Sequence, residues 1–241
     1  NMISLMVDVV GRDERRPWLG DSFTDEIQSL CYLYDFAAFG ANEEQVILDA
    51  MGPDGSCPGQ LRNANKSGAS SAAGWADACV TTPFFLAMNY ADRKTLAEGY
   101  AGAKKFIDMI FRNNTNYVPG RVYGGTFGDW LSSPKTLAPG ASSWSDVGKQ
   151  TAPADFFAAA WWTRSARLTA LMSEALGREK DAGLYAGMSE KVRAELLRKY
   201  RKPDGSLANG SQSVYALALD FDLLDEKDRK AALTNLFRAI E

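Results

Sequence analysis

The chain has 241 residues, enough for one sizeable hydrophobic core, and its 27 basic and 30 acidic residues leave a net charge of −3. This balance gives no electrostatic reason to expect nucleic acid or an anionic membrane as a partner. Histidine is absent, which excludes serine–histidine–aspartate triads, cysteine–histidine dyads and zinc sites of the histidine type. Acid–base chemistry would therefore fall to Asp, Glu, Lys, Tyr or Cys.

Apolar residues recur with helical spacing in long segments, and Gly- and Pro-rich loops separate these segments. No segment is a convincing strand. Paired helices around one core favour an all-α fold, either an α/α toroid or an irregular helical domain, and the absence of a linker favours one domain over 1–241. The helices are predicted at 23–36, 43–50, 77–89, 92–112, 153–176, 180–200, 213–221 and 226–240.

Loops and turns add three expectations. Asp92 is in position to cap the fourth helix. Pro-Asp-Gly-Ser occurs after a helix at 53–56 and again at 203–206, a weak sign of a repeated helix-pair unit. The irregular stretch 113–149 is long for a connection, and its aromatic residues, among them Tyr117, Tyr123, Phe127 and Trp130, favour an ordered, functional loop.

Cysteine content and hydropathy narrow the class of protein further. An odd count of three cysteines without a repeated spacing indicates buried thiols rather than a disulfide framework. No cofactor and no metal site is indicated. No apolar run is long enough for a transmembrane helix, and the first residues lack the pattern of a signal peptide. We expect a soluble protein of unknown compartment and oligomeric state, and both ends read as the interior of a longer domain.

The densest polar cluster lies between Asp8 and Asp21, just before the first predicted helix. It holds four carboxylates, three arginines and a tryptophan. A charge run is usually a solvated loop, but Trp18 stands among these charges, where a flat ring could stack on a sugar. Glycoside hydrolysis needs one carboxylic acid for the leaving oxygen and a second carboxylate as base or nucleophile. The cluster therefore contains the residue types of a glycosidase site.

The stretch Arg12-Asp13-Glu14-Arg15-x-x-Trp18-x-Gly20-Asp21 resembles the signature that precedes the first barrel helix of the α-L-rhamnosidase family. Asp8 falls at the place of the leading Asp of that signature, six residues before the Glu. Three more segments resemble family motifs in the same order: Gly-Trp-Ala-Asp-Ala at 74–78, Gly-Asp-Trp-Leu at 128–131 and Ser-Gln-x-x-Tyr-Ala-Leu-Ala at 211–218. Each motif is weak alone, and the ordered set covers essentially the whole chain.

The resemblance implies a fold, a reaction and a set of site residues. The fold is an (α/α)6 barrel, and the reaction is release of terminal α-L-rhamnose from glycans or glycosides with inversion at the anomeric carbon. Glu14 would be the general acid. Trp18 and Trp75 would form the pocket walls, and Asp77 would add a contact to a sugar hydroxyl. The other residues expected to bind substrate are Asp8, Arg12, Asp21, Asp129 and Trp130.

The sequence also departs from the family pattern. Val9 and Val10 stand in place of Cys-Pro, and Pro17 stands in place of a Gly, while the acidic positions are kept. The family's base is a Glu in a Trp-Glu pair, and no such pair occurs here. Eight predicted helices also fall short of the twelve of a full barrel. We therefore expect this chain to be the N-terminal and middle part of a barrel, with the base and the last helices beyond Glu241.

Two other functions stay open at this point. A polysaccharide lyase on a related α/α barrel would need a cationic site for a uronate, and Arg12, Arg15 and Arg16 could supply that charge. A non-catalytic sugar-binding relic is the third hypothesis. Retention of Glu14 together with Asp8 and Asp21 argues against it.

Overall fold

The structure is a computed structural model, and it describes residues 17–20, 27–61, 71–120, 122–123 and 152–240. Within these ranges all regular elements are helices, and pairing of strand type is limited to two isolated bridges. The predicted all-α class is confirmed. The helices are α1 (Ile27–Leu33), α2 (Ala37–Asp49), α3 (Ala78–Tyr90), α4 (Arg93–Asn113), α6 (Ala154–Ala175), α7 (Glu179–Tyr200), α8 (Gln212–Asp220) and α9 (Glu226–Ile240).

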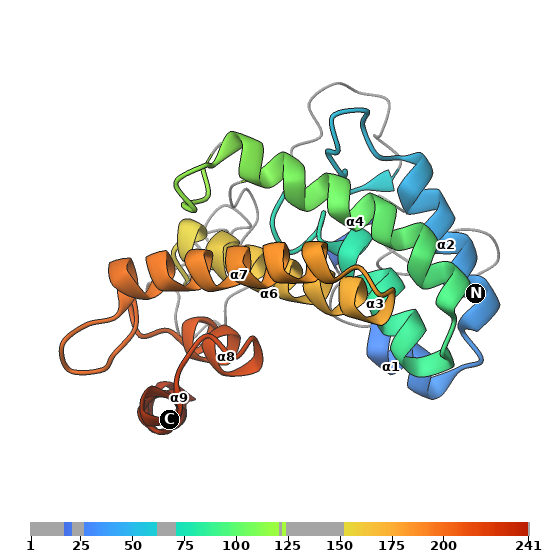
Figure 1. Cartoon of the computed structure of the whole chain (residues 1–241). Coiled ribbons are helices and arrows are strands. Elements are labelled where there is room, and N and C mark those ends of the chain that lie inside the picture. The colour runs from blue at the N-terminus through green and yellow to red at the C-terminus, as the bar shows by residue number, and fades with distance from the viewer. Residues whose placement is uncertain (1–16, 21–26, 62–70, 121, 124–151, 241) are drawn as a thin grey trace.

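The helices follow one another as pairs and lie in two layers (Figure 1). The first helices of successive pairs touch each other, α1 with α3, α3 with α6, and α6 with α8, so they form the inner layer. Of the second helices, α4, α7 and α9 pack on the outside of their partners, and α2 packs against α3 and α4. This arrangement is an arc of an α/α toroid, in which most residues of α3 and α6 are buried.

Short turns and long connections alternate along the chain, which places them at opposite ends of the helices. The turns between α3 and α4 and between α6 and α7 take only a few residues, and Ala91 and Gly177 adopt positive φ there. As predicted, Asp92 caps α4, because its carboxylate accepts the backbone N–H groups of Lys94 and Thr95 at 3.0 and 3.1 Å. The described residues of the long connections 50–77, 114–153 and 201–211 lie at the other end of their helices, which we call the long-loop end.

The first two predicted helices have different limits in the structure. The described part of α1 ends at Leu33, before the predicted limit, and α2 begins at Ala37, six residues before the predicted start. The cause is tertiary: Phe36 is buried, and the hydroxyl of Tyr90 on α3 accepts its backbone N–H at 3.0 Å. This hydroxyl also lies 3.3 Å from the carbonyl oxygens of Cys31 and Tyr34. A distant side chain therefore fixes the bend between the two helices.

The two Pro-Asp-Gly-Ser turns have the same structure. In each, the Asp carboxylate accepts the backbone N–H and the hydroxyl of the Ser two residues later, at 3.0 and 2.7 Å for Asp54 and at 2.9 and 2.7 Å for Asp204. The intervening Gly55 and Gly205 have φ of 94° and 81°, which favours glycine. Each turn follows an outer helix, α2 or α7, at the long-loop end.

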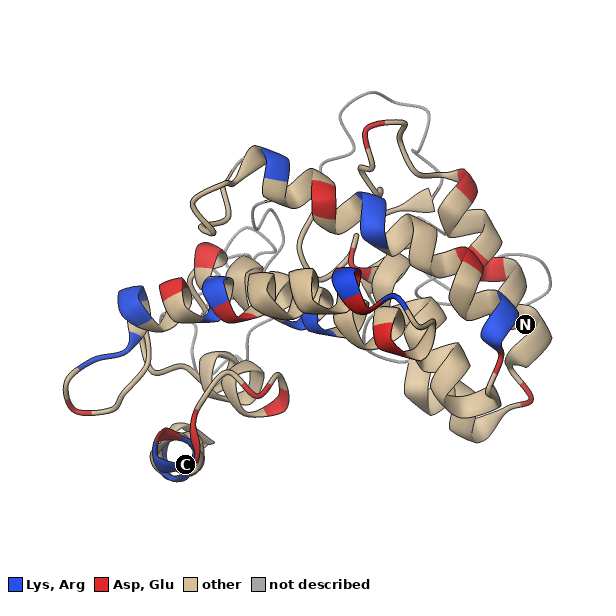
Figure 2. Cartoon of the chain, viewed as in Figure 1, with Lys and Arg blue, Asp and Glu red and all other residues tan. Residues whose placement is uncertain are grey.

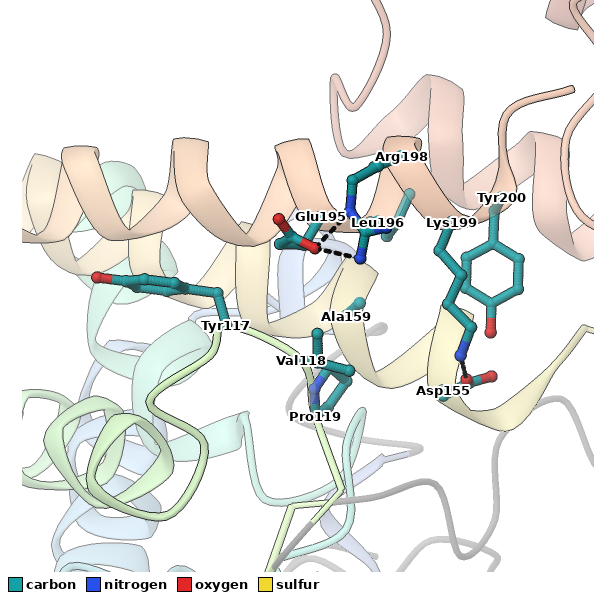
Figure 3. A pocket seen from close by; sticks show the side chains of 10 residues that line it. All are labelled: Tyr117, Val118, Pro119, Asp155, Ala159, Glu195, Leu196, Arg198, Lys199 and Tyr200. Carbon is teal, nitrogen blue, oxygen red and sulfur yellow. Dashed lines mark hydrogen bonds and ion pairs between the residues drawn. The ribbon is translucent and has the colours of Figure 1, made fainter. Parts of the chain in front are cut away.

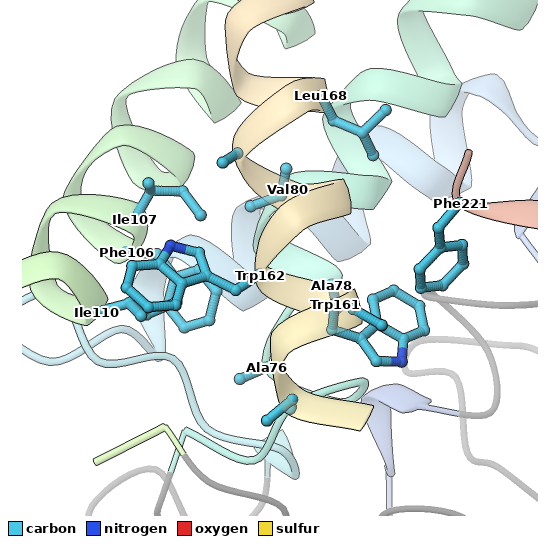
Figure 4. Packing of buried hydrophobic residues seen from close by; sticks show 14 of the residues in the cluster. Ala76, Ala78, Val80, Phe106, Ile107, Ile110, Trp161, Trp162, Leu168 and Phe221 are labelled. Atoms are coloured by element: carbon cyan, nitrogen blue, oxygen red, sulfur yellow. The ribbon is translucent and has the colours of Figure 1, made fainter. Parts of the chain in front are cut away.

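The core centres on α6 (Figure 4). Trp162 lies beside Phe106 and Ile107 of α4, whereas Trp161 turns to the other side and meets Phe221 edge-on, with ring centroids 4.9 Å apart. Both indoles are buried, so this pair serves packing. Because α6 presents large rings on two sides, it joins the α3–α4 pair to the α8–α9 pair.

The charged residues of the described part lie mainly on the outer helices (Figure 2); both signs occur on α4, α7 and α9, whereas α2 carries only acidic residues. Most ion pairs join neighbouring turns or adjacent helices, such as Lys104 with Asp108 and Arg164 with Asp220. None of the described helices is long and apolar enough to cross a membrane. Cys31, Cys57 and Cys79 are free thiols, as the odd count predicts.

Candidate functional site at the long-loop end

Residues 17–20, at the end of the polar cluster between Asp8 and Asp21, pair with the connection between α2 and α3. Trp18 and Gln60 form an antiparallel bridge, in which the N–H of Leu19 donates to the carbonyl of Gly59 at 3.0 Å. The N–H of Leu61 donates to the carbonyl of Pro17 at 3.2 Å. Leu19 is fully buried, whereas Trp18 stays partly exposed. The bridge therefore fixes residues 17–20, which follow Glu14 in the sequence, and Trp18 stays partly exposed there.

The same segment touches the second motif of the resemblance. A Cβ atom on Gly20 would lie 2.5 to 2.7 Å from three atoms of the Trp75 indole, so only glycine fits against that ring. Gly59 is also close, since its Cβ position is 3.1 Å from the Cβ of Trp75. Trp75 is partly exposed. Two tryptophans 57 positions apart in the sequence thus belong to one packed unit with an open side.

Asp77 lies directly after this turn, and its side chain is 0% exposed. Its carboxylate accepts the backbone N–H of Gly74 at 2.8 Å and the hydroxyl of Ser165 at 2.5 Å. The hydroxyl of Tyr123 lies 3.0 and 2.9 Å from its two oxygens. Burial raises the pKa of Asp77, and the hydrogen bonds from Ser165, Gly74 and Tyr123 oppose this in part. Its neighbours satisfy this carboxylate, and the geometry favours a supporting role over contact with a sugar hydroxyl.

Gly74 has two reasons to be glycine. Its φ is 80°, in the left-handed region, and a Cβ there would lie 2.9 Å from the Phe157 ring and 3.1 Å from the indole nitrogen of Trp161. Both rings are on α6. The turn that carries Trp75 is therefore pressed onto the central helix of the core.

Of the expected site residues, Trp18, Trp75 and Asp77 are in the described part, and the structure brings them together. The general acid and the other expected contacts, Asp8, Arg12, Glu14, Asp21, Asp129 and Trp130, lie outside the described residues. So does the expected pocket in which Glu14 meets Asp8, Asp21, Trp18 and Trp75.

Sequence reasoning did not identify Tyr123 and Ser165 as members of the site. Ser165 lies in a helix of buried alanines and tryptophans, and a polar residue at such a position needs a partner. This was the only available signal for Ser165. Tyr123 gave no local signal, because its partner is 46 positions away.

A small hollow lies where α6 begins and α7 ends (Figure 3). Asp155 and Lys199 form an ion pair across it, and Arg198 pairs with Glu195 beside it. Burial would raise the pKa of Asp155, but its hydrogen bond with Lys199 brings that pKa below the ordinary value. The volume is about 20 Å³, which holds about one water molecule. This hollow is too small for a sugar ring.

Two larger hollows lie among the described residues, away from Trp18 and Trp75. One, of about 640 Å³, is apolar and lies beside the short turns, with Phe84, Met88 and Leu171 in its wall. The other, of about 340 Å³, lies between α2 and α4 next to Glu44 and Glu98. In the described part of the chain, no group of three or more Cys, Asp and Glu side chains is arranged to hold a metal ion. The region around Trp18 and Trp75 therefore remains the candidate site.

The whole chain, residues 1–241, matches the model of the bacterial α-L-rhamnosidase six-hairpin glycosidase domain. The chain belongs to this family. An α-L-rhamnosidase of Streptomyces avermitilis is 30% identical over the full chain, and one of an Alteromonas species is 28% identical. The chain spans 21% and 25% of these two relatives.

Solved structures of the rhamnosidase family have the same arrangement of helices. The native rhamnosidase of Aspergillus terreus superposes with a TM-score of 0.85 at 26% identity, over 100% of this chain and 27% of that one. The Streptomyces avermitilis enzyme, solved in complex with L-rhamnose, gives a TM-score of 0.81 at 28% identity, over 99% of this chain and 21% of that one. The chain is thus part of a six-hairpin glycosidase barrel.

Proposed function

We propose that the protein containing this chain is an α-L-rhamnosidase, a glycoside hydrolase that releases terminal α-L-rhamnose from glycans or glycosides with inversion. The observation that carries the proposal is the contact between Gly20 and Trp75. It joins the segment that follows Glu14 to the second family motif at the long-loop end. The names of the relatives and the rhamnose bound by one of them support the same substrate.

In this proposal Glu14 donates the proton that the departing glycosidic oxygen takes up. An inverting enzyme needs a second carboxylate that activates water on the opposite face of the sugar, about 6.5–9.5 Å from the acid. We assign that base to no residue of this chain, because the family's Trp-Glu pair is absent from it.

The walls of the proposed pocket are Trp18 and Trp75, whose partly exposed rings offer apolar faces to the C–H bonds of the sugar. The hydroxyl groups of rhamnose would be held by polar side chains near the acid and from the loop that follows Tyr123. We assign these contacts to Asp8, Arg12, Asp21 and Asp129, with Trp130 beside them. The ligand is a carbohydrate, and we propose neither nucleic acid nor a membrane as a partner.

The test compares the full-length protein with its Glu14→Gln variant on p-nitrophenyl α-L-rhamnoside and on a natural rhamnoside. Loss of a general acid lowers the rate about 10²–10⁴-fold, and we expect this loss on the natural substrate. The loss is smaller on the aryl glycoside, since nitrophenolate departs without a proton. Proton NMR of the first-formed sugar reports its anomer and tests inversion.

The matched control is Glu226→Gln, which changes the same side chain on the exposed start of α9 and should keep full activity. An unaffected Glu14→Gln variant would remove Glu14 from its proposed role. A folded full-length protein that cleaves neither substrate would overturn the rhamnosidase proposal. Formation of an unsaturated, ultraviolet-absorbing product from a uronate-containing glycan would then identify a lyase.

A further inference from the structure

Asp77 joins three segments that are distant in the sequence. Its carboxylate accepts the N–H of Gly74 in the turn before α3, the hydroxyl of Tyr123 after α4 and the hydroxyl of Ser165 in the middle of α6. All three partners act as donors. A carboxylate with two acceptor oxygens suits this set of donors better than any neutral side chain of similar size.

Each of the three segments has a different relation to the proposed pocket. Gly74 directly precedes Trp75, a proposed wall of the pocket, in the sequence. Tyr123 stands four positions before the segment 127–131, which carries Asp129 and Trp130. Ser165 belongs to the central helix of the core, where it is fully buried. Asp77 therefore joins the turn that carries Trp75 and the residue Tyr123 to one buried helix.

The hydroxyl of Tyr123 keeps its proton in this network. Burial and the adjacent Asp77 raise the pKa of the Tyr123 hydroxyl far above its ordinary value, so Tyr123 remains a donor. The Ser165 hydroxyl donates to the Asp77 side chain at 2.5 Å.

We propose that Asp77 is a positioning residue for the reaction: it holds the turn of Trp75 through Gly74, and it holds Tyr123, which precedes Asp129 and Trp130 in the sequence, through the tyrosine hydroxyl. This inference rests on the proposed function. It differs from direct recognition of a sugar hydroxyl, because the carboxylate is completely covered.

Two substitutions separate the two connections. Asp77→Asn places an NH₂ group opposite one of the donors. This removes a hydrogen bond to Gly74, Tyr123 or Ser165. Tyr123→Phe leaves the Gly74 and Ser165 contacts and removes only the connection to the loop. The matched control is Tyr185→Phe, which deletes a buried tyrosine hydroxyl that donates to Asp108 at 2.8 Å, between α4 and α7 and outside the site.

The first readout is kinetic and uses the full-length protein. We expect Tyr123→Phe to raise KM for the rhamnoside and Kd for free rhamnose by about tenfold, as expected when contact residues are misplaced, whereas Tyr185→Phe leaves both unchanged. The melting temperature is measured for each variant, so that altered binding is read only from folded protein. If Asp77→Asn does not fold, Tyr123→Phe decides the outcome.

The second readout does not need activity. In protein labelled with 5-fluorotryptophan, the resonance assigned by its loss in Trp75→Phe should shift or broaden in Asp77→Asn, while that of Trp130 should do so in Tyr123→Phe. Tyr185→Phe should leave both in place. Wild-type values of KM and Kd in folded Asp77→Asn and Tyr123→Phe, with unchanged Trp75 and Trp130 resonances, would overturn the inference. A wild-type protein without rhamnosidase activity would instead overturn the proposed function, and the fluorine spectra would still decide the role of Asp77.

Discussion

Replacing Gly74 by Ala tests how tightly the Trp75 turn is pressed onto α6. The backbone has φ of 80°, and an L-residue in that region costs about 1–2 kcal/mol. The new methyl group would also lie 2.9 Å from the Phe157 ring and 3.1 Å from the Trp161 nitrogen, and overpacking of this kind costs about 1–3 kcal/mol. We expect Gly74→Ala to lower the free energy of unfolding by about 2–5 kcal/mol.

The matched control for this prediction is Gly177→Ala. Gly177 has φ of 70°, close to that of Gly74, and nothing lies within 4 Å of its Cβ position. It therefore measures the backbone term alone, about 1–2 kcal/mol. Urea denaturation gives both values, provided that the slope with denaturant stays that of the parent protein. Equal losses in the two variants would refute the argument that α6 packs closely under the turn.

Three further predictions concern the helices. Gly183 is an exposed residue inside α7 with open space at its Cβ position, so Gly183→Ala should raise the free energy of unfolding by about 0.5–1 kcal/mol; an unchanged melting curve would contradict this. Asp92→Ala should cost about 1 kcal/mol at pH 7 through loss of the α4 cap. Hydrogen bonds with Thr95 lower the pKa of Asp92, so its contribution is present at neutral pH and lost as the pH falls through that lowered pKa; a cost that persists in acid would refute it. Glu44 is 3% exposed, both of its oxygens lack a hydrogen-bond partner, and burial with the nearby charges of Glu98 and Asp92 raises its pKa from 4.5 to about 8. Between these pH values only the unfolded state ionises, so stability falls as the pH rises, and Glu44→Gln should flatten this decline in a series of unfolding curves; an unchanged pH dependence would contradict the prediction.

Local sequence patterns were sufficient to predict the limits of those helices and turns that are formed by local interactions. The helices α3, α4, α6, α7, α8 and α9 begin and end within two residues of the predicted limits, because their periodicity, caps and turns act over one or two helical turns. Asp92 and the two Pro-Asp-Gly-Ser turns belong to this class. The start of α2 does not, because the residue that fixes it, Tyr90, is 54 positions away from Phe36.

The candidate site also combines features that are local in the sequence with features that depend on tertiary contacts. The order of the carboxylates and tryptophans along the rhamnosidase motifs can be read from the sequence, because a motif is a property of neighbouring residues. The contact of Gly20 with Trp75 and the burial of Asp77 under Gly74, Tyr123 and Ser165 arise from packing between distant segments. An aspartate has the same local pattern whether it faces a sugar or three protein donors. Its role depends on burial, and burial is set by segments that meet only when the helices have packed.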